Sequence, residues 1–292
     1  MDTRPSPVTI VHLSDLHFGG FADLKQIEAL DNFLPTLDPT AVAVSGDLSQ
    51  RARHGEFQAA HLFLQRVRAV APTLVVPGNH DIEWWKSPLD LLGEKRKYTK
   101  YTRYFSDLRP VLEVPGVVLA GALSSYGVAF GSLTLRLRDL AVKGHMPKSE
   151  TTRVRKIFDA ATPGAAKVMV FHHNVLPGGL SGRMGLARWR SAHKRLLATG
   201  ADVILSGHDH QEGAGQIQGA LAVSTSGTHS SRVRGGRPSV FNLVKIDAEA
   251  IHIQHFRWVS TDRQFIPSDT NSFARRGPPQ LAVSVAGGDQ GL

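Results

Sequence analysis

The feature that most constrains the fold is a series of short apolar runs, rich in β-branched residues, each followed at once by a polar, glycine-containing stretch. Short runs of this composition, bounded by turn residues, are typical of buried β-strands. They are Val8–Leu13, Ala41–Val44, Leu74–Val76, Val117–Ala120, Val168–Phe171 and Val203–Leu205. Because these runs are continuously apolar, they indicate strands that are covered on both faces.

Helical patterns lie between these runs, with apolar residues recurring at spacings of three and four. The predicted helices are Leu24–Leu34, Glu56–Val67, Thr151–Ala161 and Trp189–Ala198. Ser149 or Thr151 is expected to cap the third helix, and Gly200 to end the fourth. The alternation of strand and helix predicts an α/β architecture.

The last third of the chain has a different pattern. Three segments alternate apolar and polar residues as antiparallel strands do, namely Ala220–Ser226, Ser239–Ile246 and Ala250–Trp258. After Pro267 the composition turns to Ser, Arg, Pro and Gly, which predicts disorder from about Arg275 onward. We therefore expect one catalytic domain over residues 1–270 and a flexible tail over residues 271–292.

The segment formed by residues 84–112 is rich in Lys, Arg and Tyr, and it is predicted to be a lid or an insertion beside the site. Its aromatic residues include Trp84, Trp85, Tyr98, Tyr101 and Tyr104. They have two interpretations: a lid that stacks a nucleobase, or an amphipathic helix that packs on the domain. Packing is the favoured interpretation.

The chain contains no cysteine, which excludes thiolate metal sites and a cysteine nucleophile. Any metal ion must therefore be held by oxygen and imidazole nitrogen ligands. The formal net charge is +9, from 34 Lys and Arg against 25 Asp and Glu. An excess of positive charge attracts phosphorylated small molecules, nucleic acids or anionic lipid surfaces, and it does not choose among them.

The N-terminal apolar run, Val8–Leu13, is too short for the hydrophobic region of a signal peptide with its cleavage site. No stretch of the sequence reaches the roughly 20 apolar residues that a membrane-spanning helix needs. We therefore expect a cytoplasmic protein without a membrane span.

Residues of the types that bind metal ions recur directly after the predicted strands. They occur in five turns, Asp15-Leu16-His17, Gly46-Asp47, Gly78-Asn79-His80-Asp81, His172-His173 and Gly207-His208-Asp209-His210. Because ligands bind outside the carboxyl ends of strands in open α/β sheets, we expect these turns to converge on one crevice. In three of the turns a glycine precedes the ligand residue, which permits a sharp turn or a close approach of the backbone.

Two of these turns carry ligand residues at alternate positions, Asp15-x-His17 and His208-x-His210. Alternate side chains of an extended backbone point the same way, so each pair is expected to address the same space. Counting ligands gives two metal ions. The first would be held by Asp15, His17, Asp47 and His210, and the second by Asp47, Asn79, His172 and His208.

Two ions that share a carboxylate can catalyse a displacement reaction at phosphorus. Such a site clamps the attacking and leaving oxygens of an in-line displacement and lowers the pKa of a bridging water. Mixed carboxylate, amide and imidazole ligands suit manganese, iron or zinc.

The five turns, in this order over residues 15–210, resemble the motifs of the calcineurin-like metallophosphoesterase superfamily. The flanking residues look most like the bacterial cyclic-nucleotide phosphodiesterase branch, through Ser14-Asp15-Leu16-His17, Gly46-Asp47-Leu48-Ser49 and Ser226-Gly227-Thr228. The resemblance implies a four-layer αββα sandwich, in which two mixed β-sheets are flanked by helices. It also implies the ligand assignment given above.

The resemblance further implies roles for residues around the ligands. His80 would contact the phosphate and protonate the leaving group, and Asp81 would orient His80. Asn174 stands where the family usually has proline, and this leaves open whether His172 or His173 is the metal ligand. Our assignment is His172, which leaves His173 as a neighbouring or substrate contact.

Several cations are candidates for binding an anionic substrate. Arg51 and Arg53 follow Gly46-Asp47, where many relatives carry acidic or small residues. Arg232 and Arg234 lie in a polar loop after His229 and either contact the phosphate or form a solvated loop. For His229 itself, a place near the site and a polar surface both remain open, whereas His145 and His193 have no motif around them and are predicted to lie on the surface.

These observations predict a two-metal phosphoesterase. The expected activity is a phosphodiesterase that acts on a nucleotide-like or other small phosphodiester through attack of a metal-bridging hydroxide. Two alternatives with the same metal core are a nuclease and a lipid-nucleotide pyrophosphatase, and a non-catalytic scaffold is a third. The expected partner is a small phosphorylated substrate, with nucleic acid as a second candidate, and the sequence does not indicate an oligomeric state.

Overall fold

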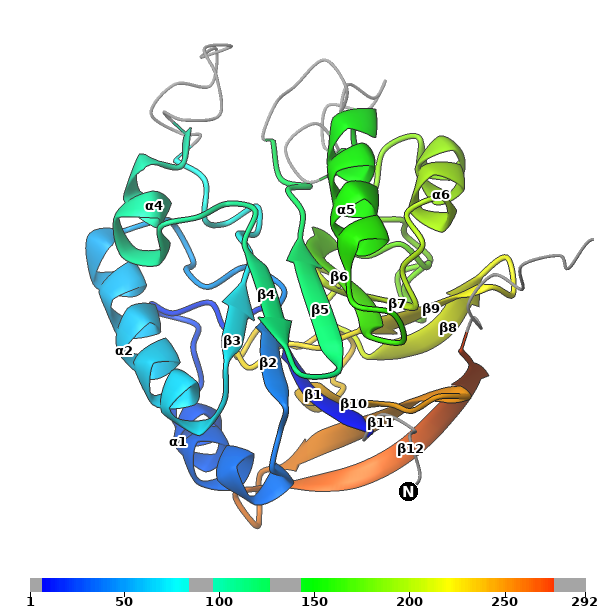
Figure 1. Ribbon diagram of the computed structural model, residues 1–292. Helices are drawn as coiled ribbons and strands as arrows, with labels where there is room; N and C mark the ends of the chain where they lie inside the picture. The colour runs from blue at the N-terminus through cyan, green and yellow to red at the C-terminus, as the bar shows by residue number, and fades with distance from the viewer. Residues whose placement is uncertain (1–6, 84–96, 127–142, 276–292) are drawn as a thin grey trace, which may run out of the picture.

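The computed structural model describes residues 7–83, 97–126 and 143–275 of the chain. Two six-stranded sheets face each other, and helices cover their outer faces (Figure 1). The strand order is β12-β11-β10-β1-β2-β3 in the first sheet and β4-β5-β6-β7-β9-β8 in the second. The expected four-layer αββα sandwich is therefore confirmed.

Both sheets are mixed. The first contains β1 Val8–Leu13, β2 Ala41–Val44, β3 Thr73–Val75, β10 Val240–Ile246, β11 Ala250–Val259 and β12 Gln264–Ala274. In it β1, β2 and β3 are parallel, whereas β10, β11 and β12 add on in antiparallel fashion. The second contains β4 Val111–Val114, β5 Val117–Gly121, β6 Ala166–His173, β7 Val203–Gly207, β8 Gly213–Ile217 and β9 Leu221–Thr225. Its four central strands are parallel, and its edge strands β4 and β8 are antiparallel.

The helices divide between the two outer faces. They are α1 Leu24–Phe33, the 3-10 helix η1 Leu34–Leu37, α2 His54–Val70, α4 Thr99–Phe105, α5 Lys148–Ala160 and α6 Trp189–Leu197. Helices α1, α2 and α4 cover the first sheet, and α5 and α6 cover the second (Figure 1). Among the described residues, no helix has both the length and the apolar character needed to cross a membrane.

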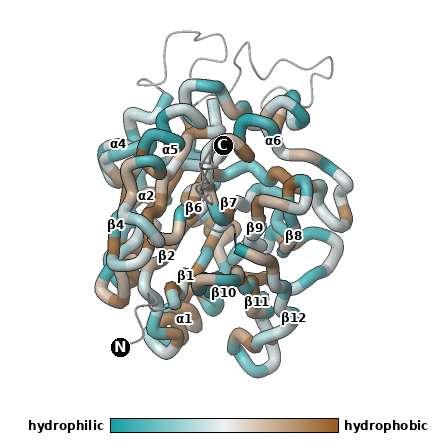
Figure 2. The backbone as a smooth tube through the Cα atoms, turned by 45° about the vertical axis from the view of Figure 1, so that its right-hand side comes forward, coloured by the Kyte–Doolittle hydropathy of each residue, from teal (hydrophilic) through white to brown (hydrophobic). Residues whose placement is uncertain are grey.

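Three hydrophobic clusters separate the four layers. Along β1, Val8 and Ile10 join the cluster between the sheets, whereas Val11 and Leu13 join the cluster beneath α1 and α2. The third cluster lies between the second sheet and its two helices. Hydrophobic stretches accordingly follow the strands of both sheets, and hydrophilic ones follow the connecting turns (Figure 2). Both faces of the central strands are buried, which explains their continuously apolar sequences.

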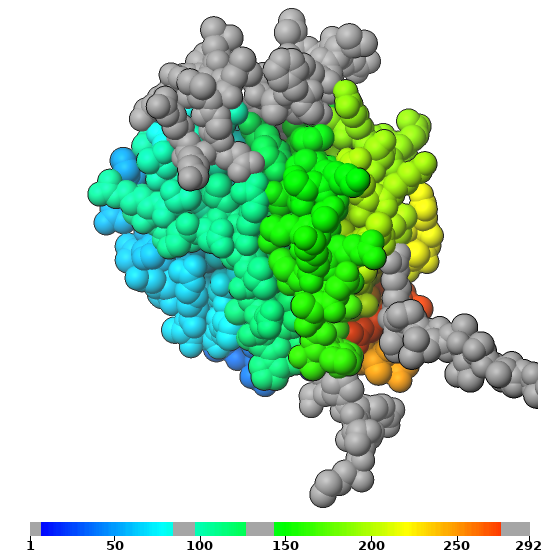
Figure 3. All heavy atoms as spheres, turned by 45° about the horizontal axis from the view of Figure 1, so that its top comes forward, coloured from blue at the N-terminus to red at the C-terminus, as the bar shows by residue number. Residues whose placement is uncertain are grey.

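Segments around α4 and α5 lie side by side on one face of the molecule (Figure 3). Arg109, which follows α4, donates to the Glu150 carboxylate at the start of α5. Tyr98 and Tyr101 are fully buried in the cluster beneath α2, so the packing interpretation is confirmed for these two residues. Trp84 and Trp85 lie outside the described residues.

Some predicted boundaries differ from the structure. Helix α5 begins at Lys148 after Pro147, and neither Ser149 nor Thr151 caps it. Strand β12 extends to Ala274, so the boundary placed at residue 270 falls inside a strand. Strands β4, β8 and β12 lie at sheet edges, where exposed and polar residues leave no continuous apolar run to detect.

Candidate metal centre

The predicted ligand residues meet where the parallel strands end. Asp15 follows β1, Asp47 follows β2, and His172 lies at the end of β6. One ligand atom from each of Asp15, His17, Asp47 and His210 lies within 4.8 Å of the others. The structure therefore brings together the residues predicted for the first metal ion.

Asp15 and His210 of this first set each use one polar atom for orientation and present another to the centre. The Oδ2 atom of Asp15 accepts from the Ser14 hydroxyl at 2.6 Å and from the His208 amide at 2.9 Å. Its Oδ1 atom is buried without a hydrogen-bond partner among the described residues, and it lies 3.2 Å from His210 Nε2. His210 donates from Nδ1 to the Arg232 carbonyl at 2.7 Å, which leaves Nε2 facing Asp15. An unpartnered carboxylate oxygen among imidazole nitrogens fits a bound cation.

The second set gathers around the other side of Asp47. Its Oδ2 atom lies 3.3 Å from His172 Nε2 and 3.8 Å from His17 Nε2, and so faces both sets. The Asn79 Oδ1 atom lies 3.0 Å from His172 Nε2 and 2.9 Å from His208 Nδ1. All seven residues predicted as ligands therefore converge.

The two neighbouring histidines at the end of β6 point to different places. His172 donates from Nδ1 to the Ser45 carbonyl at 2.9 Å and directs Nε2 toward Asp47 and Asn79. His173 is buried behind His208, with ring centroids 4.5 Å apart, and its Nδ1 atom lies 2.9 Å from the Ser124 hydroxyl. His173 does not line the cavity over the centre, so of its two predicted roles its position favours that of a neighbour of the ligands.

The backbone of the ligand turns is left-handed rather than extended. The φ angles are 54° at Asp15, 47° at His17, 52° at Asp47, 78° at His208 and 55° at His210. The two alternate pairs converge as predicted, but they do so through left-handed turns and not through an extended backbone. Residues other than glycine rarely adopt this conformation, and clusters of such strain are characteristic of functional sites.

The glycines in these turns are required by close approach, as expected. A Cβ atom on Gly78 would lie 2.1 Å from Asp47 Oδ1, and one on Gly207 would lie 1.8 Å from the Ser14 hydroxyl oxygen. Gly46 has a φ angle of +99°. Any larger residue at Gly78 or Gly207 would push apart loops that must touch.

Burial and mutual charge set the titration of the ligands in the metal-free protein. Burial raises the pKa of Asp15 and Asp47, but the surrounding histidines outweigh it and hold both pKa values below the ordinary range. Burial lowers the pKa of His172, and the Asp47 carboxylate outweighs this and raises it to about 9. The centre therefore keeps ionised carboxylates, which is the state that binds cations.

Asp81 does not orient His80 directly, which corrects the predicted role. Its carboxylate accepts from the amides of Leu48 at 3.1 Å, Ser49 at 2.8 Å and Gly78 at 2.9 Å. It thus ties the loop after β2 to the loop after β3. Burial and the nearby Asp47 carboxylate raise the pKa of Asp81 to about 6.

The residue that orients His80 is Gln50. The Nδ1 atom of His80 donates to the Gln50 carbonyl at 2.8 Å, which directs Nε2 toward Arg232, where it lies 3.4 Å from Nη1. Sequence reasoning missed Gln50 because the acceptor is a main-chain carbonyl, which every residue type carries.

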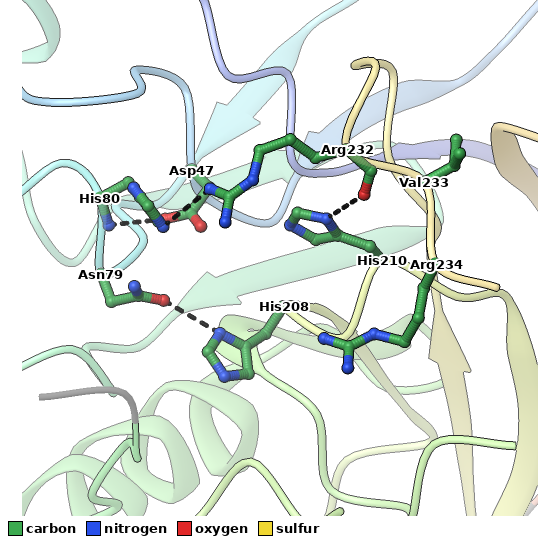
Figure 4. Close-up of a pocket in the computed structure, with 8 residues that line it drawn as sticks. All are labelled: Asp47, Asn79, His80, His208, His210, Arg232, Val233 and Arg234. Carbon is green, nitrogen blue, oxygen red and sulfur yellow. Dashed lines mark hydrogen bonds between the residues drawn. The ribbon is translucent and has the colours of Figure 1, made fainter. Parts of the chain in front are cut away.

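A cavity of about 410 Å³ opens over the centre. Its lining residues are Asp47, Asn79, His80, His208, His210, Arg232, Val233 and Arg234 (Figure 4). The guanidinium group of Arg232 extends toward His80 across the pocket (Figure 4). Arg51 is exposed and does not line the cavity, so its predicted substrate contact is not supported by its position.

Three further histidines that the sequence singled out do not line the cavity. His193 is buried and donates from Nε2 to the Val175 carbonyl at 2.7 Å, so the prediction of a surface position is wrong. His193 lies on the buried face of α6 with Ala192 and Leu196, and a helix this short gives too few apolar positions to identify that face from the sequence. His229 is buried and its amide donates to the Asp15 carbonyl at 3.3 Å, so of its two predicted positions it takes the one near the site, although it does not line the cavity. His145 is half-buried.

Comparisons with known proteins agree with this geometry. A family model described as calcineurin-like phosphoesterase matches residues 8–212. No curated protein sequence matches the chain.

Three solved structures show the same fold at low sequence identity. Purple acid phosphatase PPD1 from yellow lupin (Lupinus luteus) seeds aligns with a TM-score of 0.65 and 12% identity, over 93% of this chain and 54% of that chain. This chain therefore spans about half the length of the lupin protein, as the 54% coverage shows. A dimetal phosphatase from Danio rerio aligns with a TM-score of 0.63 and 11% identity, over 92% of this chain and 99% of that chain. GAP50, the anchor in the inner membrane complex of Plasmodium, aligns with a TM-score of 0.56 and 13% identity, over 94% and 90%.

Proposed function

Because the chain belongs to the calcineurin-like phosphoesterase family, we propose that it is a metal-dependent phosphodiesterase acting on a nucleotide-like or other small phosphodiester. The family supports a phosphoester hydrolase that uses divalent metal ions. The preference for diesters and the roles of individual residues are part of the proposal.

The observation that carries the proposal is the position of the Asp47 carboxylate. One of its oxygens faces His17 of the first set and His172 of the second, at 3.8 and 3.3 Å. We assign one ion to Asp15, His17, Asp47 and His210, and the other to Asp47, Asn79, His172 and His208. Manganese, iron or zinc suits these donors. When bound, two such ions supply a water of lowered pKa and offset the negative charge of the phosphoryl oxygens.

We assign to His80 the role of the acid that protonates the leaving alkoxide. The Gln50 carbonyl accepts from Nδ1, so the Nε2 atom faces the pocket, and as the acid His80 would be an imidazolium that carries the transferred proton on Nε2. An imidazole suits this role because its ordinary pKa lies near neutrality. We expect His80→Ala to slow a diester with a poor leaving group more than bis(p-nitrophenyl) phosphate. An equal loss on both substrates would remove the acid role.

Arg232 is assigned the contact with a phosphoryl oxygen. Its Nη1 atom lies 3.4 Å from Gln50 Oε1 and 3.4 Å from His80 Nε2, and its guanidinium carbon lies 5.6 Å from the Phe21 ring centroid. No carboxylate of the described chain forms an ion pair with it. Arg234, in contrast, lies 3.4 Å from the Asp209 carboxylate and donates to its carbonyl at 2.9 Å. Arg232 thus brings an uncompensated positive charge to the pocket, which suits phosphate recognition.

The test is hydrolysis of a substrate panel by the manganese-loaded protein. The panel contains cyclic nucleotides, dinucleotides, glycerophosphodiesters and single-stranded DNA. Turnover of a small diester supports the proposal, and loss of turnover in Asp47→Asn ties it to this centre. Preferred cleavage of DNA, with affinity falling steeply as salt rises, would instead favour the nuclease alternative. No turnover of any phosphoester would overturn the proposal.

A further inference from the structure

A row of polar side chains interrupts the apolar layer between the two sheets. On β1 the residues that face this layer are Val8 and Ile10, and the next residue on that face is His12. Three other strands also carry a polar residue at this end of the layer. These residues are Asn242 on β10 and His255 on β11 of the first sheet, and Ser224 on β9 of the second sheet. His12 lies opposite Asn242, and Asn242 lies opposite His255, in the registers of the first sheet. All four side chains are buried.

These side chains form one continuous hydrogen-bonded chain that crosses from one sheet to the other and back. His255 Nδ1 lies 2.7 Å from Asn242 Oδ1, and Asn242 Nδ2 lies 2.8 Å from the Ser224 hydroxyl oxygen. Ser224 lies 3.0 Å from His12 Nδ1. His12 Nε2 lies 3.0 Å from the hydroxyl of Ser45, the residue that follows β2. We call these five residues the inter-sheet network.

The hydrogens of the network have one consistent arrangement. Asn242 Nδ2 also donates to the Thr225 carbonyl at 2.9 Å, and a carbonyl can only accept, so the orientation of the amide is fixed. His255 therefore donates to Asn242 Oδ1. Because the Ser224 oxygen accepts from Asn242, its hydrogen is available for His12 Nδ1. His12 then carries its hydrogen on Nε2 and donates to Ser45.

This arrangement requires a neutral His12. Burial lowers the pKa of His12 to about 3, so the imidazole stays neutral at ordinary pH. The Ser45 hydroxyl in turn points to the Leu13 carbonyl at 3.4 Å. His12, Ser224, Asn242 and Ser45 thus have partners for their side-chain donors, which is the condition under which buried polar groups rigidify a core rather than weaken it.

The network ends at a ligand of the proposed metal centre. The main-chain carbonyl of Ser45 accepts from His172 Nδ1 at 2.9 Å. That bond holds the His172 hydrogen on Nδ1 and turns Nε2 toward Asp47 and Asn79. We propose that the inter-sheet network is a positioning device for His172, and that it acts by fixing Ser45 between β2 and Asp47. The proposal rests on the proposed function, because it assumes that His172 binds the second ion.

The effect of the network is expected to be selective. The first set takes its orientation from the Ser14 hydroxyl, the His208 amide and the Arg232 carbonyl, and of these only the Ser14 hydroxyl also reaches the Ser45 carbonyl, at 3.4 Å. None of these bonds passes through the side chains of the network. Breaking the network should therefore weaken binding of the second ion more than that of the first.

The experiment uses metal-stripped full-length protein titrated with Mn²⁺ by calorimetry. The electron paramagnetic resonance spectrum is recorded at each ratio of ion to protein. The variants are His12→Leu and Asn242→Asp, of which the second keeps the shape of the side chain but cannot donate to Ser224. Ser224→Ala removes only the hydroxyl that links His12 to Asn242, and it replaces either of the other variants if that variant does not fold. His193→Leu is the matched control, because His193 is a buried histidine bonded to a carbonyl outside the network.

We expect the wild type to bind two ions and to show the spectrum of a coupled pair. The network variants should bind the second ion about 10- to 100-fold more weakly, as changes behind a metal ligand commonly do, and show the spectrum of an isolated ion at intermediate loading. His193→Leu should lose stability to urea yet keep both affinities. Unchanged affinities in the network variants, or an equal loss for both ions, would overturn the inference. A wild type that binds fewer than two ions would count against the proposed function instead.

Discussion

The two ligand sets of the centre differ in charge and in what orients them. The first contains two carboxylates, Asp15 and Asp47, whereas the second has only the shared Asp47 and adds the neutral amide of Asn79. The first is oriented by loop groups that surround the pocket, and the second depends on Ser45 and the buried layer behind it. A cation gains more Coulomb energy from two carboxylates than from one. We therefore expect the first ion to bind tightly and the second ion to be the adjustable one.

The largest effect is expected at the residue that both sets share. Asp47→Asn should release both ions and lower hydrolysis by about 10³-fold or more, because the ions contribute several kcal/mol to the transition state. Calorimetric titration and steady-state kinetics measure the two effects. Asp202→Asn is the control, since Asp202 is a buried carboxylate that pairs with Arg275 far from the centre. Retention of one tightly bound ion in Asp47→Asn would show that the carboxylate is not shared.

Single replacements within each set should separate the two ions. Asp15→Asn removes a charge from the first set, and Asn79→Ala removes a neutral donor from the second. We expect Asp15→Asn to weaken one ion by roughly 100-fold, and Asn79→Ala to weaken the other by a smaller factor, because a charge contributes more than a dipole. Ion stoichiometry at fixed free Mn²⁺ is the measurement. If both variants weaken the same ion, the division into two sets fails.

The two arginines of the pocket loop provide a third comparison. Arg232→Gln should lower kcat/KM for a small diester by roughly 10²-fold, since it removes a charged donor at the reacting group. Arg234→Gln should cost less than about tenfold, because Asp209 already offsets its charge. Neither variant should alter ion binding, since His210 is held by the main chain of Arg232 and not by its side chain. A larger loss in Arg234→Gln would reverse the assignment.

Taken per pH unit, the smallest effect concerns the acid stability of the metal-free protein. Burial lowers the pKa of His12 to about 3, against 6.5 in the unfolded chain. The folded state therefore binds fewer protons than the unfolded state between these values. The stability that neutral His12 provides is fully present above pH 6.5 and is lost as pH falls toward 3, by at most about 1.4 kcal/mol per pH unit. Urea unfolding of wild type and His12→Leu should give a shallower pH slope in the variant, and parallel slopes would contradict it.

Much of the architecture follows from the sequence because buried parallel strands have a strong signature. Val8–Leu13 and Ala41–Val44 have the predicted limits, since continuous apolar runs reflect burial on both faces. The edge strand Gly213–Ile217 has no such run and is invisible to this reasoning. The convergence of the candidate ligand turns could be predicted because Asp, Asn and His gather directly after buried strands.

Orientation within the site was harder to predict. The acceptors for His80, His172 and His210 are main-chain carbonyls of Gln50, Ser45 and Arg232, and a carbonyl is present at every position whatever the residue. The inter-sheet network was missed for a related reason. A histidine or asparagine within a strand indicates nothing until the register shows which residues stand opposite each other.

Arg232 joins two tasks in one residue, with its carbonyl on His210 and its guanidinium group beside His80. An outward swing of this loop would withdraw the substrate contact and, in the same movement, unseat a ligand of the first ion. On the proposed function, entry of a bulky substrate would therefore be coupled to retention of the metal. Lengthening this loop to widen the pocket is therefore expected to weaken metal binding before it broadens the range of substrates.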